Sequence, residues 1–209
     1  ACASSFDQPI GSWNVSNVTN MDVMLACTPF NQDISGWDVS KVTIMKGMFD
    51  SNSKFDQDIS GWDVSSVTNM SEMFRAASSF NSSLSSWNVS NVTNMDMMFQ
   101  DANTFNQNIN DWDVSNVVGM NHMFAGASSF DQPLGDWDVS SVTTMDNMFR
   151  NSQFNQDIGY WDVSNVLTMQ QMFQDSPFNN DGSDSINNWN MSANTNISYW
   201  SLRTPFNQP

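Results

Sequence analysis

Seven Asn or Asp residues, each directly after a tryptophan, carry side chains suited to bind a cation or a partner. These candidates are Asn14, Asp38, Asp63, Asn88, Asp113, Asp138 and Asp162, and Asn190 continues the same column in the last repeat. Carboxylate oxygens are ligands that Ca²⁺ prefers. If stacked repeats line these residues up on one exposed face, Asp113, Asp138 and Asp162 become neighbours, and we predict weak divalent-cation binding there. The alternatives are a solvated acidic face, Asp side chains that bond backbone amides in their own turns, and direct contact with a partner.

Catalytic chemistry has few candidate residues in this chain. His122 is the only histidine, and other repeats place unrelated residues at its position, so we interpret it as a solvent-facing side chain. No nucleophile elbow, phosphate loop or metal-ligating Cys/His cluster is present in the sequence. We therefore predict that the protein is not an enzyme.

The two cysteines, Cys2 and Cys27, fall at equivalent positions of adjacent repeats. Stacked strands would separate their Cα atoms by about 5 Å, within the roughly 4.4–6.8 Å range of a disulfide. We predict a disulfide between them. The alternative is that two small thiols fill a slot that alanine occupies elsewhere.

Composition limits the class of partner. The chain has 209 residues, with 6 Lys and Arg against 22 Asp and Glu, which gives a formal net charge of −16. This charge repels nucleic acid and anionic lipid, and no apolar run approaches the roughly 20 residues that a membrane helix needs. The hydrophobic content of 39 % and 9 tryptophans favour a folded chain over a disordered one. We expect a monomer that neither binds nucleic acid nor inserts into a membrane.

Tryptophan and phenylalanine recur with a period of 24 or 25 residues along most of the chain. The tryptophan column is Trp13, Trp37, Trp62, Trp87, Trp112, Trp137, Trp161 and Trp189, with a last step of 28. A period between 20 and 50 residues is typical of solenoids and arrays, in which each repeat stacks on its neighbours. Fourteen of the 16 methionines fall in two further columns, which predicts that they fill the core.

One repeat, "FDQDISGWDVSSVTNMSEMFRAASS" at 55–79, indicates the elements that would position these side chains. Trp62 and Val64 are two residues apart and would face the same way from a strand. Val67, Met70 and the pair 73–74 are spaced as on a helix. We predict an α/β solenoid of about eight coils, with a short parallel β-sheet on one side and short α- or 3₁₀-helices on the other.

The pattern "F-N-Q-D-I-S-x-W-D-V-S-N-V-T-N-M-x-x-M-F" resembles the short BspA-like leucine-rich repeats of surface proteins and lipoproteins. The resemblance covers nearly the whole chain. It implies a right-handed solenoid and a role in adhesion or protein binding at a cell surface or after secretion.

The sequence predicts one repeat domain over 1–209, as a piece of a longer array. A divergent last coil at 178–205 contains "DGSD" at 181–184, which accounts for four extra residues.

We expect a non-enzymatic surface module that binds an extracellular protein or glycan. A passive spacer in a surface protein is one alternative, and a binder needs a non-repeating patch that a spacer does not. A weak divalent-cation-binding array is another. An ice- or mineral-binding face is the third, suggested by a threonine column: Thr19, Thr43, Thr68, Thr93 and Thr143.

Overall fold

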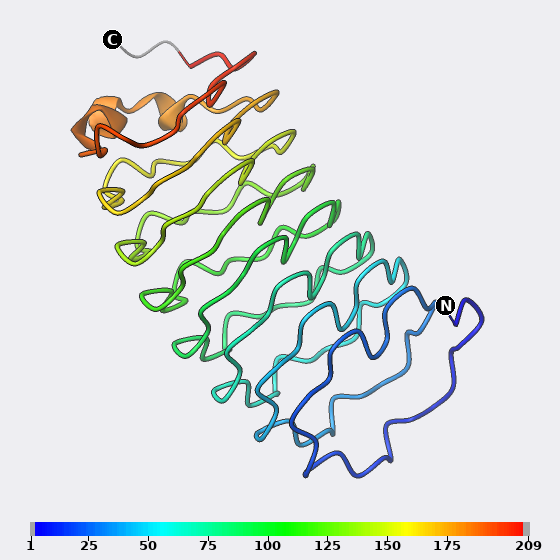
Figure 1. Cartoon of the computed structure of the whole chain (residues 1–209). Helices are drawn as coiled ribbons and strands as arrows, with labels where there is room; N and C mark the ends of the chain where they lie inside the picture. Colours follow the sequence, from blue (N-terminus) through cyan, green and yellow to red (C-terminus); the bar gives the residue numbers. More distant parts are fainter. Residues whose placement is uncertain (1–2, 207–209) are drawn as a thin grey trace.

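The computed structural model describes residues 3–206, which form a stack of loops that follow one another from the N- to the C-terminal end (Figure 1). Each loop is one sequence repeat. Neighbouring repeats meet at single parallel bridges, the first between Asn20 and Ile44 and the last between Thr168 and Asn196. Within residues 3–206 the only helices are two short 3₁₀-helices, η1 (Asn180–Gly182) and η2 (Asp184–Asn188), and no extended strand forms.

The expected α/β solenoid, with a parallel sheet facing a row of helices, is therefore wrong. The segment from Val67 to Phe74, expected to be helical, is a series of turns in which the amide of Met73 donates to the Met70 carbonyl (3.2 Å). Glu72 and Ala76 have φ angles of 60° and 53°. A left-handed residue every four positions prevents helix propagation, since a helix needs right-handed dihedrals throughout.

Three other amides of this segment pair with the next repeat, whereas that of Thr68 donates to the Thr43 carbonyl of the preceding repeat (2.9 Å). The N–H groups of Met70, Glu72 and Phe74 donate to carbonyls 24 residues on, at 3.0, 2.8 and 2.9 Å. Amides that close turns alternate with amides that join repeats. We call this edge of the stack the backbone ladder; it comprises residues 20–27, 44–51, 69–76, 94–101, 119–126, 144–151, 168–175 and 196–203.

The expected strand at Trp62 and Val64 is also absent. The amide of Trp62 closes a turn onto the Ile59 carbonyl (3.1 Å), and its indole Nε1 donates to the Ile34 carbonyl of the preceding repeat (3.1 Å). The same indole bond recurs at each tryptophan of the column from Trp37 to Trp189. Side chains, rather than backbone pairs, join the repeats along this edge.

A second side-chain contact follows the Phe column. The Oδ1 of Asn106 accepts the amide of Asp131 (3.0 Å) and the Nε2 of Gln132 (3.1 Å), both from the next repeat. Seven residues offer Oδ1 to the next repeat's backbone in this way: Asp7, Asn31, Asp56, Asn81, Asn106, Asp131 and Asn155. Together with the indole bonds, they form what we call the side-chain ladder.

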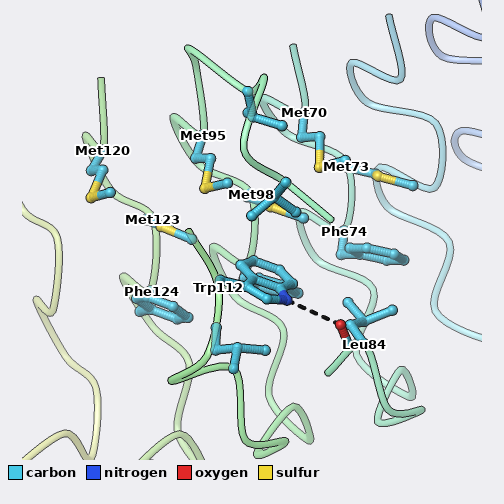
Figure 2. Close-up of a cluster of buried hydrophobic side chains, with 14 of the residues drawn as sticks. Met70, Met73, Phe74, Leu84, Met95, Met98, Trp112, Met120, Met123 and Phe124 are labelled. Carbon is cyan, nitrogen blue, oxygen red and sulfur yellow. Dashed lines mark hydrogen bonds between the residues drawn. The ribbon is translucent and has the colours of Figure 1, made fainter. Parts of the chain in front are cut away.

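The core lies between the two ladders. As predicted, the methionines fill it: Met70, Met73 and their equivalents in the inner repeats are fully buried. The phenylalanine rings stack both along the array and within a repeat, with Phe74 centred 5.6 Å from Phe99 and 4.1 Å from Phe80. Figure 2 shows this packing around Trp112, whose indole points at the Leu84 carbonyl.

The divergent last repeat carries both 3₁₀-helices (Figure 1, orange). Asn180 in η1 is fully buried, and its Oδ1 accepts the amide of Ile158 (3.0 Å). Ser185 in η2 donates its hydroxyl to the Asp157 carboxylate (2.6 Å). The extra residues thus cover the turn of the preceding repeat.

Candidate functional site

The predicted Asn/Asp column lies exposed beside the tryptophan column, and its side chains form hydrogen bonds within their own turns. The Oδ1 of Asp63 accepts both the amide (3.1 Å) and the hydroxyl (2.6 Å) of Ser65. The serine hydroxyl and then its amide hold the pKa of four of these carboxyls below the usual value: Asp38, Asp63, Asp113 and Asp162. Turn bonding by Asp was one of the alternatives, and it occupies one oxygen of each carboxylate.

The predicted cation site gains no further ligands from the fold. Asp113, Asp138 and Asp162 each accept the amide of the serine two residues on, at 3.0–3.1 Å. Throughout the part of the chain that the structure describes, no group of three or more His, Cys, Asp or Glu residues could hold a metal ion. Calcium binding by these three carboxylates stays a prediction.

The predicted disulfide is likewise untested, because Cys2 lies outside the described residues. Cys27 is half-buried at the end of the first backbone-ladder segment, with a φ of 54°.

A different surface covers the backbone ladder. Its residues stand second, fifth and sixth after the first core residue (Met, or Ile197 in the last repeat) of each repeat, and their types differ from repeat to repeat. We call this set the variable face: Val23, Ala26, Cys27, Gly47, Asp50, Ser51, Glu72, Arg75, Ala76, Met97, Gln100, Asp101, His122, Ala125, Gly126, Asn147, Arg150, Asn151, Gln171, Gln174, Asp175, Tyr199, Leu202 and Arg203. All three arginines of the chain belong to it.

The variable face carries backbone strain. Its second and sixth positions all have positive φ, and only Gly47 and Gly126 among these sixteen are glycine. A side chain in this conformation costs roughly 1 kcal/mol relative to glycine. Val23, which is β-branched, has a φ of 49° and is a marked exception to backbone preferences. Strain retained where glycine would relieve it is typical of functional surfaces.

Between the second and third repeats the charges on this face are paired. Arg75 donates Nε and Nη2 to the two carboxylate oxygens of Asp50, at 2.9 and 2.7 Å. Lys46 lies 3.5 Å from Glu72, and Arg75 lies 3.7 Å from the same carboxylate. This part of the face satisfies its own charges.

In the fifth to seventh repeats, polar groups lack partners. Among the described side chains, four buried nitrogen or oxygen atoms make no hydrogen bond: His122 Nδ1, Asn147 Oδ1, Arg150 Nε and Gln174 Oε1. All four belong to the variable face, in three consecutive repeats. We call these four residues the unpaired patch. Leaving a buried polar group unpaired costs about 1–3 kcal/mol, so their concentration in one place marks a functional candidate.

His122 lies half-buried rather than fully toward solvent. Burial lowers its pKa from 6.5, and the Arg150 guanidinium acts in the same direction, while the carboxylates of Asp146 and Asp96 oppose the shift. The imidazole is therefore held neutral near pH 7 between charges of both signs.

Sequence reasoning identified His122 as unique but missed the unpaired patch. The available signal was the contrast between columns: the positions of Trp, Val and Met repeat almost without change, whereas those of the variable face differ between every two neighbouring repeats. Recognising positions 72, 75 and 76 as parts of one surface required the turn structure of residues 69–76. The predicted helix did not group them in this way.

Comparison with known families gives one match. A family model described as "Mycoplasma protein of unknown function, DUF285" matches residues 1–110 and, in a second tandem match, 95–209. No curated protein and no solved structure matches the chain. Over residues 3–206, no helix is both long enough and apolar enough to span a lipid bilayer.

Proposed function

The chain belongs to the DUF285 family of repeat proteins, and from this premise we propose that it is a non-enzymatic protein-binding module that contacts its partner through the variable face. The finer resemblance to BspA-like leucine-rich repeats supports the same class of role. It also supports a location at the cell surface or outside the cell, with an extracellular protein as partner.

The observation that carries the proposal is the unpaired patch. A passive spacer would satisfy its buried polar atoms, as the second and third repeats do with the Asp50–Arg75 pair. The unpaired atoms of Arg150 and Asn147 instead gain hydrogen bonds only from a molecule outside the described fold, and water or a partner can supply them.

The chemistry of the variable face favours a protein over a glycan. Tyr199, at its C-terminal end, is its only aromatic residue, whereas glycan sites commonly use aromatic side chains as apolar platforms. Arg75, Arg150 and several Asp residues instead provide mixed charges, which confer specificity in protein interfaces.

The ice-binding alternative draws less support from the threonine column. The hydroxyl of Thr68 donates to the Thr43 carbonyl of the preceding repeat (3.2 Å), as do those of its equivalents. Val118 and Leu167 interrupt the column and are exposed. These hydroxyl protons are used in bonds between repeats and are not available to the surface of an ice or mineral crystal.

The test is binding of the full chain to a panel of purified extracellular-matrix and serum proteins by biolayer interferometry. One variant carries His122→Ala, Asn147→Ala and Arg150→Ala. Its matched control carries Asp63→Ala, Asp113→Ala and Asp162→Ala on the opposite edge. We expect the first triple to lose binding at least tenfold and the second to keep it. Equal effects of the two triples, or no binding to any protein of the panel, would contradict the proposal.

A further inference from the structure

We propose that Arg150, together with its unpaired neighbours His122 and Asn147, forms a binding site for a carboxylate side chain of the partner. This inference rests on the proposed function, because it specifies which chemical group the unpaired patch receives.

The molecule contains a filled copy of this site. Arg75 and Asp50 occupy the fifth position of adjacent repeats, 25 residues apart, and the guanidinium grips both carboxylate oxygens at 2.9 and 2.7 Å. Asp50 is only 8 % exposed. Bidentate pairing of this kind is the geometry that guanidinium and carboxylate prefer.

Arg150 and Ala125 occupy the same two positions three repeats later, again 25 residues apart. Ala125 stands where Asp50 stands in the filled copy, so its methyl group supplies no carboxylate. Arg150 forms no ion pair with any residue from 3 to 206, and its Nε is buried without a hydrogen-bond partner. These two repeats thus have the arginine but lack the aspartate that pairs with it in the filled copy.

Neighbouring groups complete the recognition of a carboxylate. His122, which shares a repeat with Ala125, has an unpartnered Nδ1. Asn147 and Gln174 are 9 % and 6 % exposed, and each has an unpartnered amide oxygen. The Asn147 amide also carries N–H donors, so rotation about its last bond offers a donor to the incoming oxygen. The Gln174 Nε2 already donates to the Asp175 carboxylate (3.1 Å).

Charges around the site restrict what carries the carboxylate. Asp96 and Asp146 act electrostatically on His122, and Asp101 lies on the same face in the preceding repeat. These three carboxylates repel a small free anion. They attract the lysine side chains that flank a Glu or Asp in a basic peptide segment. The expected occupant is therefore an acidic side chain within a basic segment of a protein.

The test uses the full chain and the Nε–H resonances of its three arginines by ¹⁵N NMR, at constant ionic strength set with chloride. The first probe is acetate, and the second is a blocked Lys-Glu-Lys peptide, with Lys-Gln-Lys as its control. We expect both carboxylate probes to shift the Arg150 signal saturably, the Glu peptide at least tenfold more tightly than acetate. The Arg75 and Arg203 signals, already ion-paired, stay in place.

Two variants exchange the filled and empty copies. Ala125→Asp supplies the missing acid, so the Arg150 signal moves toward that of Arg75 and stops responding to either probe. Asp50→Ala empties the first copy, so Arg75 begins to respond to acetate. An Arg150 signal that no probe shifts, or that responds equally in the Ala125→Asp variant, would overturn the proposal.

The outcomes separate this inference from the proposed function. If the triple variant at the unpaired patch abolishes partner binding but no carboxylate probe binds Arg150, the module binds protein by other contacts and only the carboxylate assignment fails. If acetate binds as tightly as the Glu peptide, the site takes a small free carboxylate, which contradicts a protein side chain as its occupant.

Discussion

The backbone ladder and the side-chain ladder join the same repeats by opposite means. On the first, main-chain amides such as that of Phe99 donate to the next repeat's carbonyls (2.9 Å to Met123). On the second, the indole of Trp112 and the amide oxygen of Asn106 reach across instead. One edge therefore holds together whatever side chains it bears, and the other depends on particular side chains.

This difference explains where the sequence varies. The column that contains Trp112 is tryptophan in every repeat, because the indole N–H is the connection. The equivalent positions Glu72, Met97 and His122 differ in each repeat, because only their amides connect. A repeat protein built this way can change its binding residues without changing its fold.

The largest predicted effect is on the side-chain ladder. Trp112→Ala removes a side chain that is 3 % exposed and leaves the Leu84 carbonyl without its donor. We expect a loss of about 3–5 kcal/mol in the free energy of unfolding, measured by urea denaturation. Trp13→Ala is the matched control: Trp13 is 54 % exposed, so its loss should be small. A loss under about 1 kcal/mol for Trp112→Ala would show that the indole column does not join the repeats.

A smaller loss of stability is expected when a polar residue of the side-chain ladder is replaced, and a nearby residue of the variable face is the control. Asn106→Ala deprives the amide of Asp131 and the side chain of Gln132 of their acceptor, and we expect it to cost about 1–2 kcal/mol. Gln100→Ala, on the variable face, should change stability by less than about 0.5 kcal/mol. Thermal unfolding of both variants checks the contrast, which fails if the two midpoints fall equally.

Glycine substitutions test whether the left-handed positions are strained, because glycine should stabilise the protein there and destabilise it elsewhere. Val23→Gly should stabilise the protein by about 1 kcal/mol, because glycine adopts a φ of 49° without steric cost. Gln100→Gly, at a position with ordinary dihedrals, should destabilise it by about 0.5–1 kcal/mol. If this segment were helical, both substitutions would destabilise, and that result would contradict the turn structure.

The smallest effect concerns pH. The pKa of His122 is lowered in the folded state, so the unfolded chain binds a proton more readily, and stability falls as pH drops through 6.5 toward the folded pKa. His122→Gln, which places the residue of the equivalent Gln171 there, should remove this loss. Melting temperatures from pH 7.5 to 5 test the difference; equal slopes for the two proteins would exclude His122 as its source.

The stacking of the repeats could be predicted from the sequence, because the Trp, Phe and Met columns repeat at one period. Their identity as a core follows from that alone. The elements could not be predicted: the spacing of Val67, Met70 and Met73 fits a helix as well as consecutive turns. Glycine would have marked the left-handed positions, but only Gly47 and Gly126 do so, and residues such as Glu72 occupy the others.

The candidate site was hidden for the same reason. For exposed Asp63 and its equivalents the sequence left cation binding and turn bonding both open, and each is bonded to a serine two residues away. The unpaired patch depends on which side chains lack partners, as at Arg150, and a sequence shows residue types but not missing hydrogen bonds.

Two triple variants, matched in number of substitutions, test most directly whether the two ladders differ as described. The first replaces three residues of the side-chain ladder by alanine: Asn81, Asn106 and Asp131. The second replaces three neighbouring residues of the variable face by alanine: Met97, Gln100 and Asp101. Their free energies of unfolding in urea, followed by tryptophan fluorescence, should fall by about 3 kcal/mol or more for the first. For the second, the fall should stay under about 1 kcal/mol. Equal losses, or a larger loss on the variable face, would contradict the account.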